Sequence, residues 1–167
     1  MDLAEFTLRR PWKNLGFGFL DTPPLATTTL ARVVLGLAIL PHGAQKLFGW
    51  FGGYGFTNTL HWFTDTLHVP WIFGLAAILA ETVGGLALVV GFATRLAAAM
   101  VGAVYLTAVV LVHGRHGFFI NWFGNQKGEG VEYFVLGLTL VVLLVIQGGG
   151  AASLDRVVAA RLGGGRK

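Results

Sequence analysis

A single acidic residue interrupts the most apolar stretch of the chain. Residues 71–93 read WIFGLAAILAETVGGLALVVGFA, and Glu81 is their one charged side chain. A helix of about 20 apolar residues spans a bilayer, so the stretch predicts a transmembrane helix with a carboxylate near its midpoint. An unpaired charge at that depth costs about 2.5–3.5 kcal/mol on insertion scales. We therefore expect other helices to cover Glu81, and a partner charge or a bound proton to neutralise it.

Composition supports a membrane environment. The chain is 54% hydrophobic and 12% charged, whereas soluble domains average about 25% charged residues. Cysteine is absent, which excludes disulfides, thiol redox relays, iron–sulfur clusters and covalently attached haem. Any redox role must therefore use a bound cofactor, a diffusible carrier such as a quinone, or a partner protein.

Four apolar segments have the length of membrane spans. They cover residues 27–50, 71–93, 95–113 and 131–148. The pattern predicts an all-α fold, an integral membrane four-helix bundle formed by one domain, residues 25–150. Residues 1–24 are expected to form an interfacial N-terminal segment and residues 151–167 a basic tail, with Ser153 capping a short tail helix over residues 154–162.

Basic residues distribute unequally between the two sides of this bundle. With both termini on one side, that side holds Arg9, Arg10, Lys13, Arg32, Arg95, Arg156, Arg161, Arg166 and Lys167. The opposite side holds Lys46, Arg115 and Lys127. This asymmetry places both termini in the cytoplasm. The net charge of +4 is thus interpreted as a topology signal, and nucleic acid is not an expected partner.

The first apolar segment is more polar than a lipid-facing span. At about 100° per residue, Arg32, His42 and Lys46 share one face, and Pro41 breaks the backbone pattern beside His42. In one interpretation, the long side chains of Arg32 and Lys46 extend to opposite membrane interfaces. His42 lies too deep for that and is either a packed core residue or functional.

The helical rise per residue places five ionisable residues in the outer half of the bundle. At 1.5 Å per residue, His42 lies roughly 20 Å and Glu81 roughly 15 Å above the cytoplasmic boundary. Arg32, at about 5 Å, is the poorest match for Glu81. The converging residues are His42, Lys46, Glu81, His113 and Glu132. His42 is the predicted nearest partner of Glu81, which functions chemically or forms a packing ion pair.

Small residues and aromatic loops complete the pattern. Gly74, Ala77, Glu81 and Gly85, with Gly84 beside them, predict a helix face that packs closely.

Phe56, Leu60, Phe63 and Leu67 predict a short interfacial helix between the first two spans. Its opposite face carries His61, Asp65 and His68, interpreted as solvated because no fourth metal ligand is evident. Phe118, Phe119, Trp122 and Phe123 indicate an aromatic belt or a lid over a lipophilic ligand.

Together these segments resemble the DoxX family of small bacterial membrane proteins. The residues that carry the resemblance are Arg32, the run 42–47 (HGAQKL), the run 81–86 (ETVGGL), the run 91–95 (GFATR), His113, Glu132 and the run 148–155 (GGGAASLD). The likeness covers roughly residues 25–156. It implies a four-span protein of the bacterial cytoplasmic membrane, associated with quinone or thiosulfate redox chemistry or with oxidative-stress complexes.

The leading functional hypothesis is a subunit of a quinone-linked membrane oxidoreductase. Quinone reduction needs proton donors beside a lipophilic slot. Glu81 and His42 are the candidate catalytic residues, for proton exchange or hydrogen bonding to a carbonyl. Lys46, His113, Glu132 and Arg32 are the candidate substrate-binding residues, and no metal ligands are assigned.

Three alternatives stay open. The charges could serve only assembly, as buried ion pairs between helices or with another protein, in a non-enzymatic scaffold subunit. A proton or small-molecule transporter would require a homo-oligomer, because four spans are few for alternating access and no inverted repeat is visible. A haem held by His42 and His113 is the weakest alternative, since their depths differ by roughly 7 Å.

Overall fold

The computed structural model describes residues 19–163, and every regular element in that range is a helix. In chain order the elements are α2 (Ala26–Phe48), the 3-10 turn η1 (Trp50–Gly52), α3 (Gly55–His61), the π-helical turn η2 (Trp62–Thr66), α4 (Trp71–Leu79), the π-helical turn η3 (Ala80–Gly84), α5 (Gly85–Val90), α6 (Thr94–Ala108), the π-helical turn η4 (Val109–His113), the 3-10 turn η5 (Gly114–His116), α7 (Glu132–Gln147) and α8 (Leu154–Gly163). Helices therefore occupy the four predicted apolar segments. The surface segment expected at residues 1–24 lies largely outside the described residues.

Several of these elements join end to end into longer helices. α4, η3 and α5 form one apolar helix over Trp71–Val90, and α6, η4 and η5 form another over Thr94–His116. Both are long and apolar enough to cross a membrane. α7 is a shorter apolar helix, and α2 has 23 residues that include Arg32 and Lys46. The all-α prediction is confirmed for residues 19–163, and two helices have the length and composition of membrane spans.

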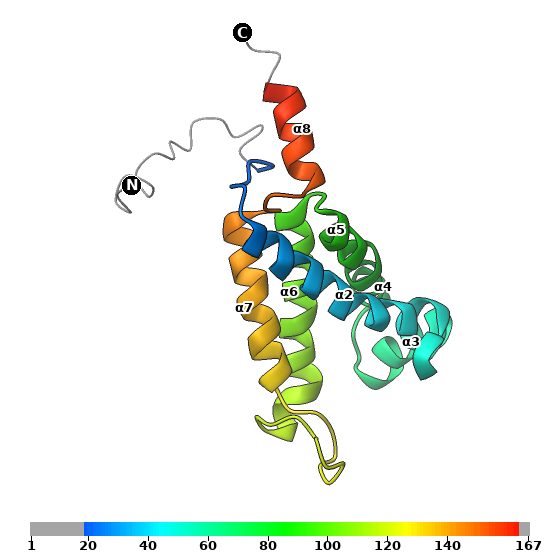
Figure 1. Cartoon of the computed structure of the whole chain (residues 1–167). Helices are drawn as coiled ribbons and strands as arrows, with labels where there is room; N and C mark the ends of the chain where they lie inside the picture. The colour runs from blue at the N-terminus through cyan, green and yellow to red at the C-terminus, as the bar shows by residue number, and fades with distance from the viewer. Residues whose placement is uncertain (1–18, 164–167) are drawn as a thin grey trace.

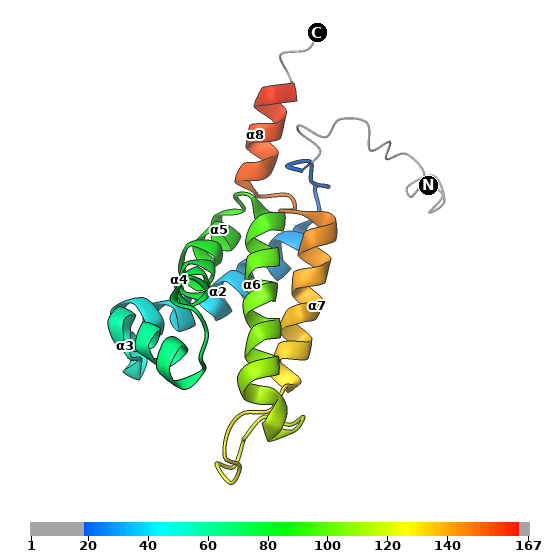
Figure 2. The ribbon, with the colours of Figure 1, turned by 180° about the vertical axis from the view of Figure 1, so that it is seen from behind.

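The helices form two antiparallel pairs that cross. α2 packs along α5 and η3, and α6 packs along α7. Figure 1 shows α6 and α7 side by side, with α2 running obliquely across them toward α3. Seen from behind, the far ends of α6 and α7 point away from α3 and α4 (Figure 2). The two pairs meet near α8 and diverge at the opposite end.

Aliphatic side chains fill the region where the pairs cross. Leu35 and Ile39 from α2, Leu88 from α5, Val101 from α6 and Leu144 from α7 are almost fully buried in one cluster. Lipid tails are as apolar as leucine, so close packing rather than transfer from water holds such a core together in a membrane. The cluster joins both helix pairs near their crossing and leaves their diverging ends free to form a cavity.

Small residues set how closely the helices approach. A Cβ at Gly36 of α2 would lie 2.9 Å from the carbonyl oxygen of Gly85. The predicted small-residue face of Trp71–Val90 is divided among three neighbours: Gly85 packs on α2, Gly84 faces α6, and Gly74 lies against side chains of α3 and η2. The helix containing Glu81 is therefore packed against protein on several sides.

Arg32 ties α2 to the chain segments around α8. Its residue surface is 1% exposed, and Nε donates a hydrogen bond to the carbonyl of Gly149 at 3.0 Å. Nη1 donates to the carbonyls of Leu88 and Val89, and Nη2 donates to that of Ala152. The prediction that Arg32 extends to the interface is wrong, because carbonyls left unpaired at the end of α5 and before α8 satisfy its donors inside the protein.

Asp155 fixes the start of α6 and lies in the first turn of α8. Its Oδ1 accepts the N–H of Ala93 at 2.6 Å, and its Oδ2 accepts the N–H of Thr94 at 2.9 Å. A carboxylate is favourable there because the first N–H groups of a helix lack partners and carry partial positive charge. Ser153 Oγ accepts the N–H of Arg156 at 3.3 Å, which confirms the predicted cap of the tail helix.

The connection between α2 and α4 contains the expected short helix. α3 continues into η2, and the side chains of Leu60 and Phe63 lie against Gly74 of α4. On the opposite face, His61 Nδ1 lies 3.2 Å from Asp65 Oδ2, and both side chains are exposed. The short helix formed by α3 and η2 thus has the apolar and polar faces that the sequence pattern predicts, and its apolar face packs on α4.

Candidate functional site

Glu81 lies in the π-helical turn η3, where the helix widens by one residue per turn. Thr82 Oγ1 of this turn donates a hydrogen bond to the carbonyl of Ile78 in α4 at 2.6 Å. The Glu81 side chain is 5% exposed. Single π-helical turns inside α-helices are frequent at functional sites, because they change the direction in which a side chain leaves the helix.

Lys46 is the ionic partner of Glu81. Its Nζ lies 2.6 Å from Glu81 Oε2, and the lysine side chain keeps 24% exposure. The contact is close because Gly43 brings α2 against the backbone of Glu81 and Thr82. Two opposite charges at this distance attract strongly where water is scarce, and each offsets the cost of burying the other.

The ion pair lies at the wall of an apolar cavity of about 360 Å³. The cavity opens between α4–η3 and α6–η4, where the helix pairs diverge. Its polar lining side chains are Lys46, Glu81, Thr107 and His113. The other lining side chains are apolar, including Trp62, Phe73 and Ala103. A volume above about 300 Å³, apolar walls and a few polar groups are the usual features of a small-molecule site.

The three π-helical turns in residues 19–163 all contribute to this cavity. η2 supplies Trp62 and Phe63, η3 supplies Glu81, and η4 supplies His113 together with two apolar residues. Irregular helical turns at membrane depth are tolerated where the backbone is buried in protein or faces a cavity. The irregular turns of three helical segments therefore all lie at the wall of one cavity.

His113 joins the cavity to the loop that follows. Its Nδ1 lies 2.9 Å from the carbonyl oxygen of Glu129, and its ring packs on Phe134 with centroids 4.6 Å apart. A carbonyl oxygen only accepts hydrogen bonds, so Nδ1 carries the proton. In the neutral ring, Nε2 is then the acceptor. The loop thereby selects the tautomer of a cavity-lining histidine.

Tyr105 and Tyr133 form a hydroxyl pair that the sequence analysis did not single out. The two oxygens lie 2.8 Å apart, and Tyr105 is buried in the core. Glu81 interacts electrostatically with Tyr105, so the pair belongs to the polar surroundings of the ion pair. A lone tyrosine in the apolar run AAAMVGAVYLTAVV was the available signal, since buried phenol groups need a hydrogen-bond partner.

The other candidate residues lie outside the cavity lining. His42 is exposed on α2, one turn before Lys46, and interacts electrostatically with both Lys46 and Glu81. The prediction that His42 is the nearest partner of Glu81 is wrong, because Lys46 reaches back along α2 to the carboxylate. Glu132 accepts the N–H of Ile120 at 3.1 Å and so organises the loop. Arg32 binds carbonyls near α8.

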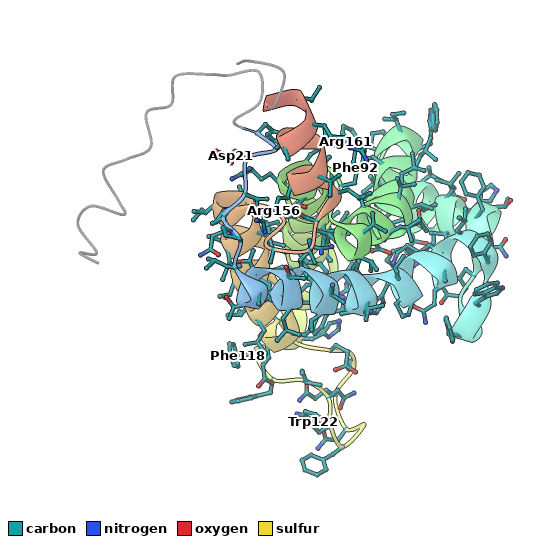
Figure 3. All side chains as sticks on the ribbon, turned by 45° about the horizontal axis from the view of Figure 1, so that its top comes forward. Asp21, Phe92, Phe118, Trp122, Arg156 and Arg161 are labelled. Atoms are coloured by element: carbon teal, nitrogen blue, oxygen red, sulfur yellow. The ribbon has the colours of Figure 1, made fainter. Side chains whose placement is uncertain are left out.

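The aromatic loop extends away from the cavity. Figure 3 shows Phe118 and Trp122 on the loop beyond the ends of α6 and α7. Phe118, Phe119, Trp122 and Phe123 are all exposed, and none lines the cavity. The loop is ordered by backbone N–H groups that donate to Glu129 and Glu132. The loop does not cover the cavity in this structure, and its exposed aromatic surface fits a belt at a membrane interface.

Metal ligands do not gather in the part of the chain that the structure describes. Across residues 19–163, no group of three His, Asp or Glu side chains has the geometry to hold an ion. His61 and Asp65 form a solvent-exposed pair. Of the two histidines considered for haem, only His113 lines the cavity. The described site therefore offers an ion pair, an imidazole and an apolar slot.

One of three comparisons with known proteins found a match. The model of the DoxX family matches residues 27–114. The matched range contains Arg32, His42, Lys46, Glu81 and His113, while Glu132 and the segment 148–155 lie beyond it. No curated protein and no solved structure matches the chain.

Proposed function

Because the chain belongs to the DoxX family of membrane proteins, we propose that it is the quinone-binding subunit of a membrane oxidoreductase. The observation that carries the proposal is the apolar cavity with the Lys46–Glu81 ion pair at its wall. A quinone ring has a flat apolar body and carbonyl oxygens at two edges. The cavity matches this chemistry, with alanine and aromatic side chains for the ring and the Lys46 ammonium as a charged donor for an oxygen.

The proposed membrane placement has four spans. α2, Trp71–Val90, Thr94–His116 and α7 are the spans, residues 25–150 form the membrane domain, and residues 151–167 form a basic cytoplasmic tail. Support comes from Arg32, Arg95 and Arg156, which belong to the α8 end, and from Lys127, which lies on the opposite loop. Both termini would face the cytoplasm of a bacterial cell.

Each polar side chain has a distinct role in this proposal. Lys46 Nζ donates a hydrogen bond to a carbonyl oxygen of the ligand and stabilises negative charge that develops there. Glu81 holds Lys46 and exchanges protons with it, and the neighbouring His42 passes protons between Glu81 and the exposed side of α2. His113 Nε2 binds the far oxygen, and it donates a hydrogen bond there when both ring nitrogens carry a proton, because Nδ1 already donates to the carbonyl of Glu129.

Electrons must come from another protein. Reduction of a quinone consumes two electrons and two protons, and this chain has no cysteine for thiol or iron–sulfur chemistry. The protein side of the reaction is therefore binding, orientation and proton supply. An oxidoreductase partner, bound within the same membrane, completes the proposal.

One observation favours a non-enzymatic assembly subunit as the second candidate. Glu81 is already neutralised by Lys46 at 2.6 Å, so a purely structural ion pair accounts for the buried charge. Under this alternative the cavity holds a lipid chain, and the exposed helix surfaces bind other subunits without any reaction.

Copurification separates the two candidates. The full chain is extracted in a mild detergent, and bound small molecules and proteins are identified by mass spectrometry. A stoichiometric quinone together with a redox protein supports the proposed function. A stoichiometric protein without quinone, in a preparation that retains phospholipid, supports the assembly role.

A further inference from the structure

An open trough lies where α5 ends and α8 begins, at the opposite end of the molecule from the aromatic loop. Its lining includes Val90, Ala152, Leu154, Val157 and Ala160, with Arg156 as the one charged side chain. Figure 3 shows Arg156 and Arg161 on α8, with Phe92 beside its first turn. The trough is amphipathic, since an apolar floor adjoins a guanidinium group.

The first turn of α8 is held in place by buried polar contacts. Arg32 Nη2 donates to the carbonyl of Ala152 at 2.6 Å, and Asp155 accepts the N–H groups of Ala93 and Thr94. A Cβ on Gly91 would lie 2.6 Å from Ser153 Cβ. Because both walls are anchored to the same buried network, the trough is a preformed feature of the fold.

Arg156, the cation of this trough, has no carboxylate partner in the described part of the chain. The ion pairs found within residues 19–163 are Lys46–Glu81 and His61–Asp65. Arg156 donates one hydrogen bond, to the carbonyl of Ala151 at 3.3 Å. A guanidinium has five N–H donors, so Arg156 retains several for an anion, and the exposed Arg161 adds charge one and a half turns further along α8.

An exposed apolar stripe leads from the trough along the helix Trp71–Val90. Leu79, Val83, Leu86 and Val90 are exposed and follow one another at steps of four, three and four residues. Side chains at these steps share one helix face. The stripe is about 16 Å long at 1.5 Å per residue. Val90 belongs to both the stripe and the trough.

We propose that this trough binds one anionic phospholipid. Arg156 pairs with the lipid phosphate, Arg161 adds attraction to the acidic headgroup, and an acyl chain lies along the stripe from Val90 to Leu79. The charge of the trough and its continuity with an apolar helix face commit the site to a lipid, which carries both chemistries in one molecule. The inference rests on the proposed membrane placement and is independent of what binds at Glu81.

Native mass spectrometry of the full chain in mild detergent tests the site. The probes are phosphatidylglycerol and phosphatidylcholine in equal amounts, since the two differ in headgroup charge. We expect the anionic lipid to remain bound in preference. Arg156→Gln should lower its bound fraction about fivefold, the factor that corresponds to about 1 kcal/mol for one basic residue at a membrane surface. Val157→Glu, which adds a carboxylate inside the trough, should lower it further.

Lys127→Gln is the matched control, because it removes the same charge from an exposed position on the opposite loop. An equal loss in this control, or equal retention of the two lipids, overturns the site. Displacement of phosphatidylglycerol by inorganic phosphate also overturns it, because phosphate alone would then be the ligand. Retention of neither lipid overturns the site as well.

Discussion

Gly43 of α2 lies directly against the backbone of Glu81, where a Cβ at residue 43 would come within 2.8 Å of the Glu81 carbonyl carbon. The contact leaves room for hydrogen only, so a glycine sets the distance between α2 and η3. Three residues further along α2, Lys46 reaches Glu81 Oε2 at 2.6 Å. The small residue and the ion pair are therefore parts of one contact between two helices.

Gly43→Ala is expected to separate these helices. The added methyl group overpacks the interface, which typically costs about 1–3 kcal/mol, and it lengthens the Lys46–Glu81 contact. The measurement is the free energy of unfolding in mixed micelles. Gly84→Ala is the control in η3 itself, because its Cβ would meet no atom closer than 3.8 Å. Similar losses for the two variants would show that close approach at Gly43 has no special role.

Lys46 and Glu81 are expected to be energetically coupled. Lys46→Met leaves Glu81 without its partner, and Glu81→Gln leaves Lys46 without its own, so each single variant loses stability. The exposed part of Lys46 keeps each loss below the roughly 3–5 kcal/mol found for fully buried pairs. The double variant removes both charges and should be more stable than the sum predicts, by about 0.5–3 kcal/mol. A double-mutant cycle in micelles measures this, and strictly additive losses would refute the coupling.

The sequence predicted the helices of this fold better than the contacts among them. Hydrophobic runs and glycine breaks placed the helices within a few residues of α2, Trp71–Val90, α6 and α7. The partner of Glu81 was wrong because depth was counted along helix axes. Side chains in a helix point toward its N-terminus, so the long Lys46 side chain reaches back to the carboxylate while the imidazole of His42 does not.

Arg32 shows a second reason why the sequence predicted contacts less well than helices. Its partners lie in the carbonyls of Gly149 and Ala152 and at the end of α5. These groups are far apart in the sequence and belong to the backbone, so no residue type marks them. A basic residue near a span end has the same sequence signal whether it faces lipid headgroups or buried carbonyls. Only the fold of the chain decides whether such a residue is exposed to headgroups or buried against carbonyls.

Arg32→Lys is expected to destabilise the protein although it keeps the charge. The guanidinium donates in several directions to carbonyls on α5 and before α8, whereas the three donors of an ammonium share one nitrogen at the end of a flexible stem and cannot reach carbonyls so far apart. Loss of two hydrogen bonds from a charged donor, at about 1.5–3 kcal/mol each, should lower the unfolding midpoint by several degrees. Arg161→Lys, at an exposed position of α8, should leave it unchanged. Equal midpoints for wild type and Arg32→Lys would contradict the network.

Asp65 is expected to titrate below its ordinary range. A hydrogen bond from Thr64 lowers the pKa of Asp65 most, and His61 lowers it further. Because the folded pKa is depressed, the stabilising contribution of the carboxylate is present at neutral pH, and it is lost as pH falls from the ordinary aspartate pKa of 3.8 through the lower folded pKa. Carboxyl carbon NMR of the micelle-bound protein measures this. Thr64→Val should raise the pKa more than His61→Gln; a reversed order would contradict the assignment.

The central claim is that the cavity beside Lys46 and Glu81 binds a quinone, and ligand-dependent thermal unfolding of two alanine variants tests it most directly. Ala103 lines the cavity, whereas Ala99 is exposed one turn earlier on α6 and does not line it. A short-chain quinone at about 100 times its Kd should stabilise wild type by about 2.7 kcal/mol, which raises the midpoint by several degrees. Ala99→Phe should retain this shift, and Ala103→Phe, which fills the slot, should lose it. Absence of a shift in wild type, or an equal shift in Ala103→Phe, would contradict the claim.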